Sequence, residues 1–335
     1  MAPAMQPARI TAIGCEARVL MERDAAWSVL AVFRRCAYLV EDVGEAVVCL
    51  GHRALGNGPL NILVETPLPE GGFGALLPAP GPNRVRAEIR DRVLRVPGLP
   101  PLAFAQAPVW SPPAVQATDS ERLARSARRI AREVVPTLAP PGVAGLLFSP
   151  SGQVPSRPME REPADRIRAA LRTMGPWLLD GGRDPRFPRA ARKLVGLGQG
   201  LTPTGDDYLG GVFLALHAAA RPDLAQRLFR ALEPDLERAT NIISRALLHC
   251  AARGMGGADM HGLLAELASG VRRPRLERLD AIGHTSGWDT FSGMLHTLSA
   301  FSRTDRPTRA AAPGDRPLDG ARPETLPARD RSNGR

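Results

Sequence analysis

The chain has 335 residues, of which 44% are hydrophobic and 23% charged, as in a folded protein of one large domain or two ordinary ones. The net charge of +10 would suit a nucleic-acid-binding protein, but the basic residues are one lysine, Lys193, and 43 arginines, and aromatic residues make up only 4%. Because no stripe of basic residues is interleaved with aromatics, we predict no binding to nucleic acid.

The cysteines and the apolar runs indicate a cytoplasmic protein. The four cysteines form no CxxC pair and no metal-like spacing, which is typical of small core residues in a reducing compartment. The opening MAPAMQPARI does not resemble a signal peptide, and the longest nearly apolar run, 208–220, is too short to cross a bilayer. We therefore predict no membrane association.

Residues 1–152 are predicted to form a β-rich domain. Short apolar runs alternate with turn residues every 8–12 positions, which favours a sandwich or barrel over βαβ units. The predicted strands are 29–33, 37–40, 46–50 and 60–64, followed by a hairpin at 84–96 and a last strand at 143–148. One helix is expected from residue 119 or 120 to 135, where apolar residues follow a helical stripe.

Residues 153–302 are predicted to form an all-helical domain, so the expected fold class is α+β. Proline, serine, threonine or aspartate precedes most of the helical patterns, and glycine ends several of them. The predicted helices are 163–179, 188–195, 203 or 205 to 219, 223–232, 234–253, 258–267, 275–282 and 286–301. Residues 303–335 are rich in Arg, Pro and Asp without apolar periodicity, which predicts a disordered tail.

The segment GLGQGLTPTGDD, residues 196–207, is the most informative motif. Three alternating glycines lead into a Thr-Pro helix start, a combination that offers backbone N–H groups and the positive end of a helix dipole to a phosphate or carboxylate. The glycines follow a predicted helix rather than a strand, which does not fit a dinucleotide-binding fold. The absence of G-K-[ST] excludes a Walker A loop.

A second copy of the helix start lies 82 residues further on. Residues 204–211 and 286–293 share the pattern [ST]-G-x-D-x-[LF]-x-G, and each copy continues into an apolar stripe at helical spacing. Two such helices, packed side by side, would direct both dipoles at one pocket, with Asp207 facing Asp289 across it. Alternatively, both copies are only capping boxes whose glycines let two helices pack closely.

These two segments, GLGQGLTPTGDDYLGG and GHTSGWDTFSG, resemble the DUF2877 family, whose named member is the AllH-type subunit of bacterial oxamate carbamoyltransferase. Residues 240–244 resemble the family's T-T-x-I-S segment, with Asn241 in place of the second threonine. Residues 27–64 look like its β-rich opening. The resemblance covers about residues 9–301.

The resemblance implies a subunit of a hetero-oligomeric transferase that acts in allantoin degradation, a branch of purine catabolism. The complex converts oxalurate and phosphate into oxamate and carbamoyl phosphate, so the implied partners are the other subunits and a small anionic substrate. Such a transfer needs N–H donors for a developing oxyanion, a phosphate cradle and a base for the amide nitrogen.

The candidate site residues follow from the motifs. We expect catalytic roles for Asp207, Asp289 and His284, the last lying two residues before the second helix start. The candidate anion-binding residues are Gly196, Gly198, Gly200, Thr202, Thr204, Gly205, Asp206, Ser286 and Gly287. If a metal is bound, the oxygen ligands of Asp206, Asp207 and Asp289 would suit Mg²⁺. Two other functions stay open: a non-catalytic metabolite-binding or scaffold subunit, and a Mg²⁺-dependent hydrolase built on the paired aspartates.

Overall fold

The N-terminal part of the chain forms a single nine-stranded sheet. The computed structural model describes residues 9–23, 25–66, 69–77, 85–113, 120–149 and 158–304. The strands are β1 (Arg9–Gly14), β2 (Trp27–Val32), β3 (Cys36–Glu41), β4 (Val47–His52), β5 (Asn61–Glu65), β6 (Arg86–Arg90), β7 (Val93–Arg95), β8 (Leu102–Ala103) and β9 (Val109–Trp110). Two short helices, α1 (Cys15–Met21) and α2 (Phe73–Leu76), and the 3₁₀ turn η1 (Arg53–Leu55) lie between them.

The strand order makes the sheet curl. The order is β8-β7-β6-β2-β3-β4-β5-β1-β9, with parallel pairing only at β4–β5 and β1–β9. The edge strands β8 and β9 are joined by residues 104–108 alone, a link that spans at most roughly 20 Å. The two edges must therefore approach each other. This confirms the predicted α+β class, and the sheet is barrel-like rather than two stacked sheets.

Alternation along β3 and β4 gives the sheet two buried faces. Leu39 and Leu50 point into the core inside the curled sheet, while Tyr38 and Val47 pack toward helix α10 (Ile242–Ala252). Successive side chains of a strand point to opposite faces, so the residues facing the helices recur at every second position. Tyr38 and Cys49 are direct partners in the β3–β4 register, and both belong to the helix-facing side.

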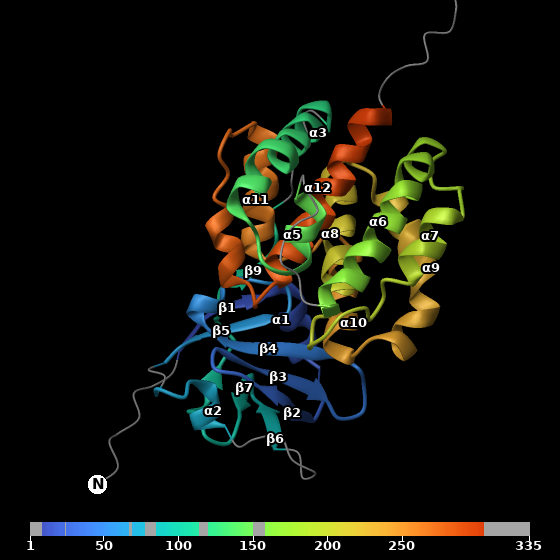
Figure 1. The fold of residues 1–335 in the computed structure, drawn as a ribbon. Helices are drawn as coiled ribbons and strands as arrows, with labels where there is room; N and C mark the ends of the chain where they lie inside the picture. Colours follow the sequence, from blue (N-terminus) through green and yellow to red (C-terminus); the bar gives the residue numbers. More distant parts are fainter. Residues whose placement is uncertain are drawn as a thin grey trace, which may run out of the picture. The chain divides into compact units, whose positions relative to one another are not determined.

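The helices from α3 onward gather on one side of the sheet (Figure 1). They are α3 (Ser120–Arg129), the π-helical turn η2 (Ile130–Val134), α4 (Val135–Leu138), α5 (Gly142–Phe148), α6 (Pro158–Leu179), α7 (Arg186–Arg192), α8 (Thr204–Ala218), α9 (Pro222–Ala239), α10 (Ile242–Ala252), α11 (Ala258–Ser269), the 3₁₀ turn η3 (Leu276–Ala281) and α12 (Ser286–Thr304). Among the described residues, no helix has the length and apolar character needed to cross a membrane.

Three predicted elements differ from the structure. Residues 143–148 form helix α5 rather than a strand, because this short apolar run is buried among other helices and has no strand to pair with. Pro234 lies inside α9, and the chain breaks instead at Asn241, whose side-chain oxygen accepts hydrogen bonds from the amides of Ile243 (3.0 Å) and Ser244 (3.1 Å). The segment predicted as a helix at 275–282 is the 3₁₀ turn η3.

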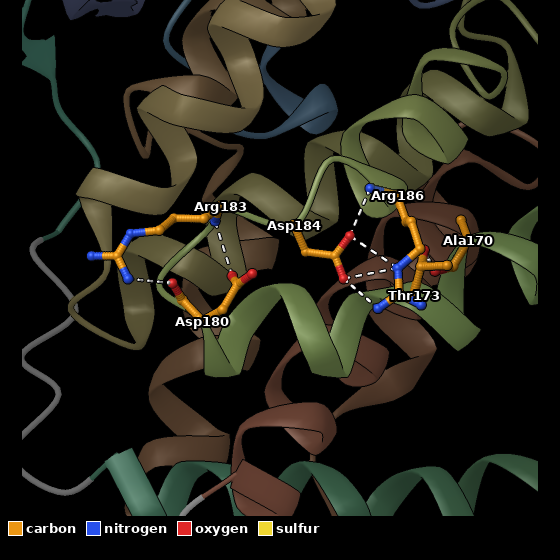
Figure 2. A network of polar contacts seen from close by, with 6 residues as sticks. All are labelled: Ala170, Thr173, Asp180, Arg183, Asp184 and Arg186. Atoms are coloured by element: carbon orange, nitrogen blue, oxygen red, sulfur yellow. Dashed lines mark hydrogen bonds and ion pairs between the residues drawn. The ribbon is translucent and has the colours of Figure 1, made fainter.

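Helix α6 ends where the glycine pair 181–182 predicts. The amide of Gly182 donates to the carbonyl of Trp177 at 2.8 Å, which closes the last turn of α6. Figure 2 shows the turn that follows: the amide of Arg183 donates to Asp180, and both the amide and the guanidinium of Arg186 donate to Asp184. Asp184 thus caps the start of α7.

All the described residues lie in one compact unit, residues 1–305. The division into domains at residue 152 stays a prediction. The predicted tail begins at residue 303, but α12 continues to Thr304, and from residue 305 onward the tail lies outside the described residues.

Candidate functional site

Helices α8 and α12 carry the two copies of the repeated motif and pack side by side (Figure 1). A Cβ atom on Gly211 would lie 2.8 Å from the carbonyl carbon of Thr290, and one on Gly293 would lie 3.0 Å from that of Tyr208. Gly211 and Gly293 are equivalent positions of the repeat, as are Tyr208 and Thr290. The contacts are therefore reciprocal, as across a local two-fold axis, and backbone meets backbone there because both positions are glycine.

The starts of the two helices meet. The hydroxyl oxygens of Thr202, just before α8, and Ser286, the first residue of α12, are 2.8 Å apart. The Ser286 hydroxyl also lies against the carboxyl group of Asp207, and its counterpart in the repeat, Thr204, lies against Asp289. Each helix start thus contributes roughly half a positive charge to one small region.

The glycine loop leaves a run of amides without partners. Within the described part of the chain, the amides of residues 198–202 donate no hydrogen bond, whereas the Gly196 amide donates to Asp206 at 2.8 Å. Gly196, Gly198 and Gly200 all have positive φ angles, of 70°, 118° and 92°, which favour glycine. A Cβ atom on Gly196 or Gly205 would also overlap a neighbouring backbone carbonyl, so these two glycines serve packing.

Asp206 anchors the loop. Its buried carboxylate accepts hydrogen bonds from the Gly196 amide, the Thr240 hydroxyl and the Ser244 hydroxyl, the last at 2.7 Å. Burial raises the pKa of Asp206, and the three donors oppose that rise. Nearby, the side-chain amide of Asn241 donates to the carbonyl of Leu201 at 2.9 Å. Asp206 therefore joins the loop to the α9–α10 junction.

Asp207 and Asp289 are less completely hydrogen-bonded than Asp206. Among the described residues, no donor with good hydrogen-bond geometry reaches Oδ2 of Asp207 or either carboxyl oxygen of Asp289, although hydroxyl groups lie beside both carboxyl groups. Burial raises the pKa of Asp207 well above its ordinary value, the charge of Asp289 adds to the rise, and the hydroxyls of Ser286 and Thr202 oppose it. Burial likewise raises the pKa of Asp289, to about 7. Near neutral pH Asp289 is therefore partly protonated.

A cavity of about 300 Å³ lies between the sheet and these helix starts. The sheet side contributes Tyr38, Cys49, Leu55 and residues 57–61. The helical side contributes Thr202, Asp206, Asp207, Gly210, Leu214, Ser244, Leu247, Leu248, Ala251, residues 255–260 and 281–283, Ser286 and Thr290. Among the described lining residues, the acidic groups are Asp206, Asp207 and Asp259, and none is Arg, Lys or His.

The structure brings part of the predicted site to the cavity. Thr202, Asp206, Asp207 and Ser286 line it. The other predicted residues lie outside the lining: Gly196, Gly198, Gly200, Thr204, Gly205, Gly287, Asp289 and His284. The His284 side chain is exposed, and that of Asp289, in the first turn of α12, is buried.

The metal prediction has no cluster to support it among the described residues, where no group of three or more His, Cys, Asp or Glu side chains could hold a metal ion. The carboxylate of Asp206 already accepts three hydrogen bonds. Mg²⁺ binding by Asp207 and Asp289 stays a prediction, which a calorimetric titration with Mg²⁺ would test.

Sequence reasoning missed the residues that the sheet contributes. Tyr38, Cys49, Asn57 and Asn61 belong to strands or turns with no catalytic pattern. The one signal was the resemblance of residues 27–64 to the family's β-rich opening, which includes the segment Gly56–Leu60. Its turn is held by Asn61, whose side-chain amide donates to the carbonyl of Gly56 at 2.9 Å.

Residues 194–298 match the family model described as oxamate carbamoyltransferase subunit AllH. The resemblance found in the two motifs is confirmed over this segment. It contains the glycine loop, both helix starts and the α9–α10 junction, and so the whole helical wall of the cavity. No solved structure matches the chain.

Proposed function

We propose that this protein is a subunit of a carbamoyltransferase complex of the oxamate carbamoyltransferase kind, and that it binds a small anion where α8 and α12 begin. The observation that carries the proposal is the 2.8 Å contact between Thr202 and Ser286 at the cavity wall, within the segment that matches the AllH family model. Phosphate, carbamoyl phosphate and oxamate are the candidate anions.

Backbone donors supply the attraction for the anion. Two helix starts converge at the cavity wall, and the amides of residues 198–202 are uncovered beside one of them. N–H groups at a helix start bind phosphate or carboxylate without a basic side chain. Backbone donors are needed because none of the described residues that line the cavity is Arg, Lys or His.

Asp207 is suited to the proton transfer of the reaction. When a phosphate oxygen attacks the carbamoyl carbon of oxalurate, the C–O bond forms, the C–N bond breaks, and the departing oxamate nitrogen takes up one proton. The attacking hydrogen phosphate loses one proton, and the carboxyl group of Asp207, which lines the cavity, passes a proton to the departing nitrogen. Burial raises the pKa of Asp207, which suits it to exchange protons with both groups. Asp289 acts on Asp207 through its charge, and the catalytic assignment of His284 stays a prediction.

The cellular setting follows from the family resemblance. We place the protein in the cytoplasm, in allantoin degradation within purine catabolism, as one part of a hetero-oligomer. The partners would be the other subunits of the transferase.

The test is the activity of the assembled complex. The chain would be co-expressed with the subunits encoded beside its gene, and carbamoyl phosphate formation from oxalurate and phosphate would be measured. We expect Asp207→Asn to lower turnover at least about 100-fold, the usual effect of removing a general acid. Gly198→Val should raise KM, because an added Cβ atom would lie 2.8 Å from the amide nitrogen of Thr204 and would shift the start of α8.

Two variants serve as controls. Asp165→Asn changes an exposed aspartate on α6, and Gly181→Val places the same side chain at another glycine of positive φ, 70°, where nothing lies within 4 Å. Both should keep the activity of the unmodified complex. Full activity of the Asp207→Asn and Gly198→Val variants would overturn the site assignment.

A non-catalytic role is the second candidate, favoured by the structural use of Asp206, whose carboxylate only ties the loop to neighbouring helices. In that case the partner subunits alone would form carbamoyl phosphate at the full rate, while this chain would still bind phosphate or oxamate.

A further inference from the structure

Tyr38 reaches the cavity from the sheet, opposite the helix starts. It is half-buried on β3, paired in register with Cys49, and its ring stands edge-on to Phe33 with centroids 6.1 Å apart. The same ring packs beside Leu201 and α10. These contacts hold the ring in place, and Tyr38 is among the residues that line the cavity.

The Tyr38 hydroxyl and the Asp207 carboxyl act on each other across the cavity. Burial raises the pKa of Tyr38 well above its ordinary value; Cys49, Cys36 and a hydrogen bond with the Cys49 thiol add to the rise, and Asp207 adds the smallest part. Tyr38 therefore keeps its proton, and its present partner, the Cys49 thiol, is a weak acceptor that a substrate carbonyl can displace. The buried Oδ2 of Asp207, which has no partner among the described residues, remains an acceptor.

One donor and one acceptor on facing walls match the two polar atoms of a primary amide. Its N–H₂ group donates to Asp207 and its carbonyl oxygen accepts from Tyr38. A carboxylate in the same place has two acceptors and no donor for Asp207. Its negative charge is also repelled, because the described lining residues include three aspartates and no basic side chain. A methyl ketone offers the carbonyl oxygen but no donor.

We propose that Tyr38 and Asp207 form the specificity-determining pair of the cavity, which selects the primary amide end of a small anionic substrate and excludes a carboxylate there. This inference rests on the proposed function, because it assumes that the same cavity binds the substrate. Tyr38 is a residue of the sheet, so the site is completed by a part of the chain outside the segment that matches the family model.

Three isosteric probes test the proposal by calorimetry on the full chain. Oxamate, pyruvate and oxalate share one carboxylate and differ at the other end, which carries NH₂, CH₃ or O⁻. We expect oxamate to bind at least about tenfold more tightly than pyruvate and oxalate, the usual contribution of a hydrogen bond to a charged group. Asp207→Asn should reduce the preference for oxamate over oxalate, because the acceptor loses its charge.

Tyr38→Phe should lower the affinities for oxamate and for pyruvate by a similar factor, about fivefold, because the carbonyl oxygen of each ligand loses its hydrogen-bond donor. The matched control is Tyr208→Phe, which alters the other of the two tyrosines, one that lies outside the lining and contacts His296 at 3.2 Å. It should leave all three affinities unchanged.

The outcomes separate the two proposals. Oxalate binding to the unmodified protein as tightly as oxamate would overturn the assignment of Tyr38 and Asp207, and this comparison needs no variant to fold. Failure of all three probes to bind would instead overturn the proposed function of the cavity and, with it, the inference that rests on it.

Discussion

Gly211 lies so close to Thr290 that an added Cβ atom would be 2.8 Å from the Thr290 carbonyl carbon. The equivalent contact joins Gly293 to Tyr208, so α8 and α12 are held by two copies of one backbone contact. This pairing sets the starts of both helices side by side, and the candidate site depends on it.

Replacing Gly211 should destabilise the protein. In Gly211→Ala the new methyl group overlaps the Thr290 carbonyl, and forcing a side chain into such a place costs about 1–3 kcal/mol of the free energy of unfolding. Gly210→Ala is the matched control, because its nearest neighbour would be the Ala251 side chain at 3.9 Å. The control should stabilise the helix by about 0.5–1 kcal/mol. Equal urea midpoints for the two variants would argue against the close contact.

The contact between the two helix starts should appear as a coupling energy. Thr202→Val and Ser286→Ala each remove one of the two hydroxyls that lie 2.8 Å apart. A double-mutant cycle measured by urea unfolding should give about 1 kcal/mol of coupling, the net value of one hydrogen bond. If the effects of the two substitutions simply add, the helix starts do not meet in solution.

Removing the Asp206 carboxylate should be costly. Asp206→Ala leaves the Gly196 amide and the hydroxyls of Thr240 and Ser244 without their acceptor, which we expect to lower the free energy of unfolding by about 3 kcal/mol. Asp165→Ala, which removes an exposed ion pair with Arg168, should change it by less than about 1 kcal/mol. A similar small effect for both would mean that Asp206 does not anchor the loop.

Asp289 should make stability depend on pH. Its pKa is about 7 in the folded protein and near 3.8 in the unfolded chain, so between these values the folded state binds more protons. Raising the pH through this window therefore lowers the free energy of unfolding, by up to about 4 kcal/mol at about 1.4 kcal/mol per pKa unit.

The neutral variant Asp289→Asn lacks this loss. Relative to the unmodified protein, it should gain stability steadily between pH 3.8 and about 7 and show no further gain above that range. Urea unfolding of both proteins over the pH series would measure the difference. Parallel stability profiles across the window would show that Asp289 titrates normally.

Local signals predicted much of the helical half. The start of α8 follows from Thr202-Pro203, the end of α6 from Gly181-Gly182, and the start of α12 from Ser286, because caps and glycines act over a few residues. The strand-length runs at 29–33 and 46–50 also became strands. The apolar run 143–148 misled the prediction, because a short apolar segment fits a strand or a buried helix equally well.

The candidate site was predicted only in part, because its residues are far apart along the chain and no local pattern connects them. The repeat predicted that two helix starts would meet, and Thr202 and Ser286 do meet. No pattern indicated that Tyr38 and Asp207 would line the same cavity. Nor did any pattern indicate that the Asp206 carboxylate accepts three hydrogen bonds while Oδ2 of Asp207 accepts none from the described residues. Those differences come from neighbours far away in the sequence, such as Thr240 and Ser244.

By itself, the sequence determined the α+β class, the two copies of the helix start and the resemblance to the AllH family. These depend on local periodicity, on caps and on motif residues that can be recognised without coordinates. Only the tertiary structure decided which carboxyl groups have raised pKa values and which side chains line the cavity. Burial and the proximity of distant groups control both properties, and they exist only once the sheet and the helices have packed together.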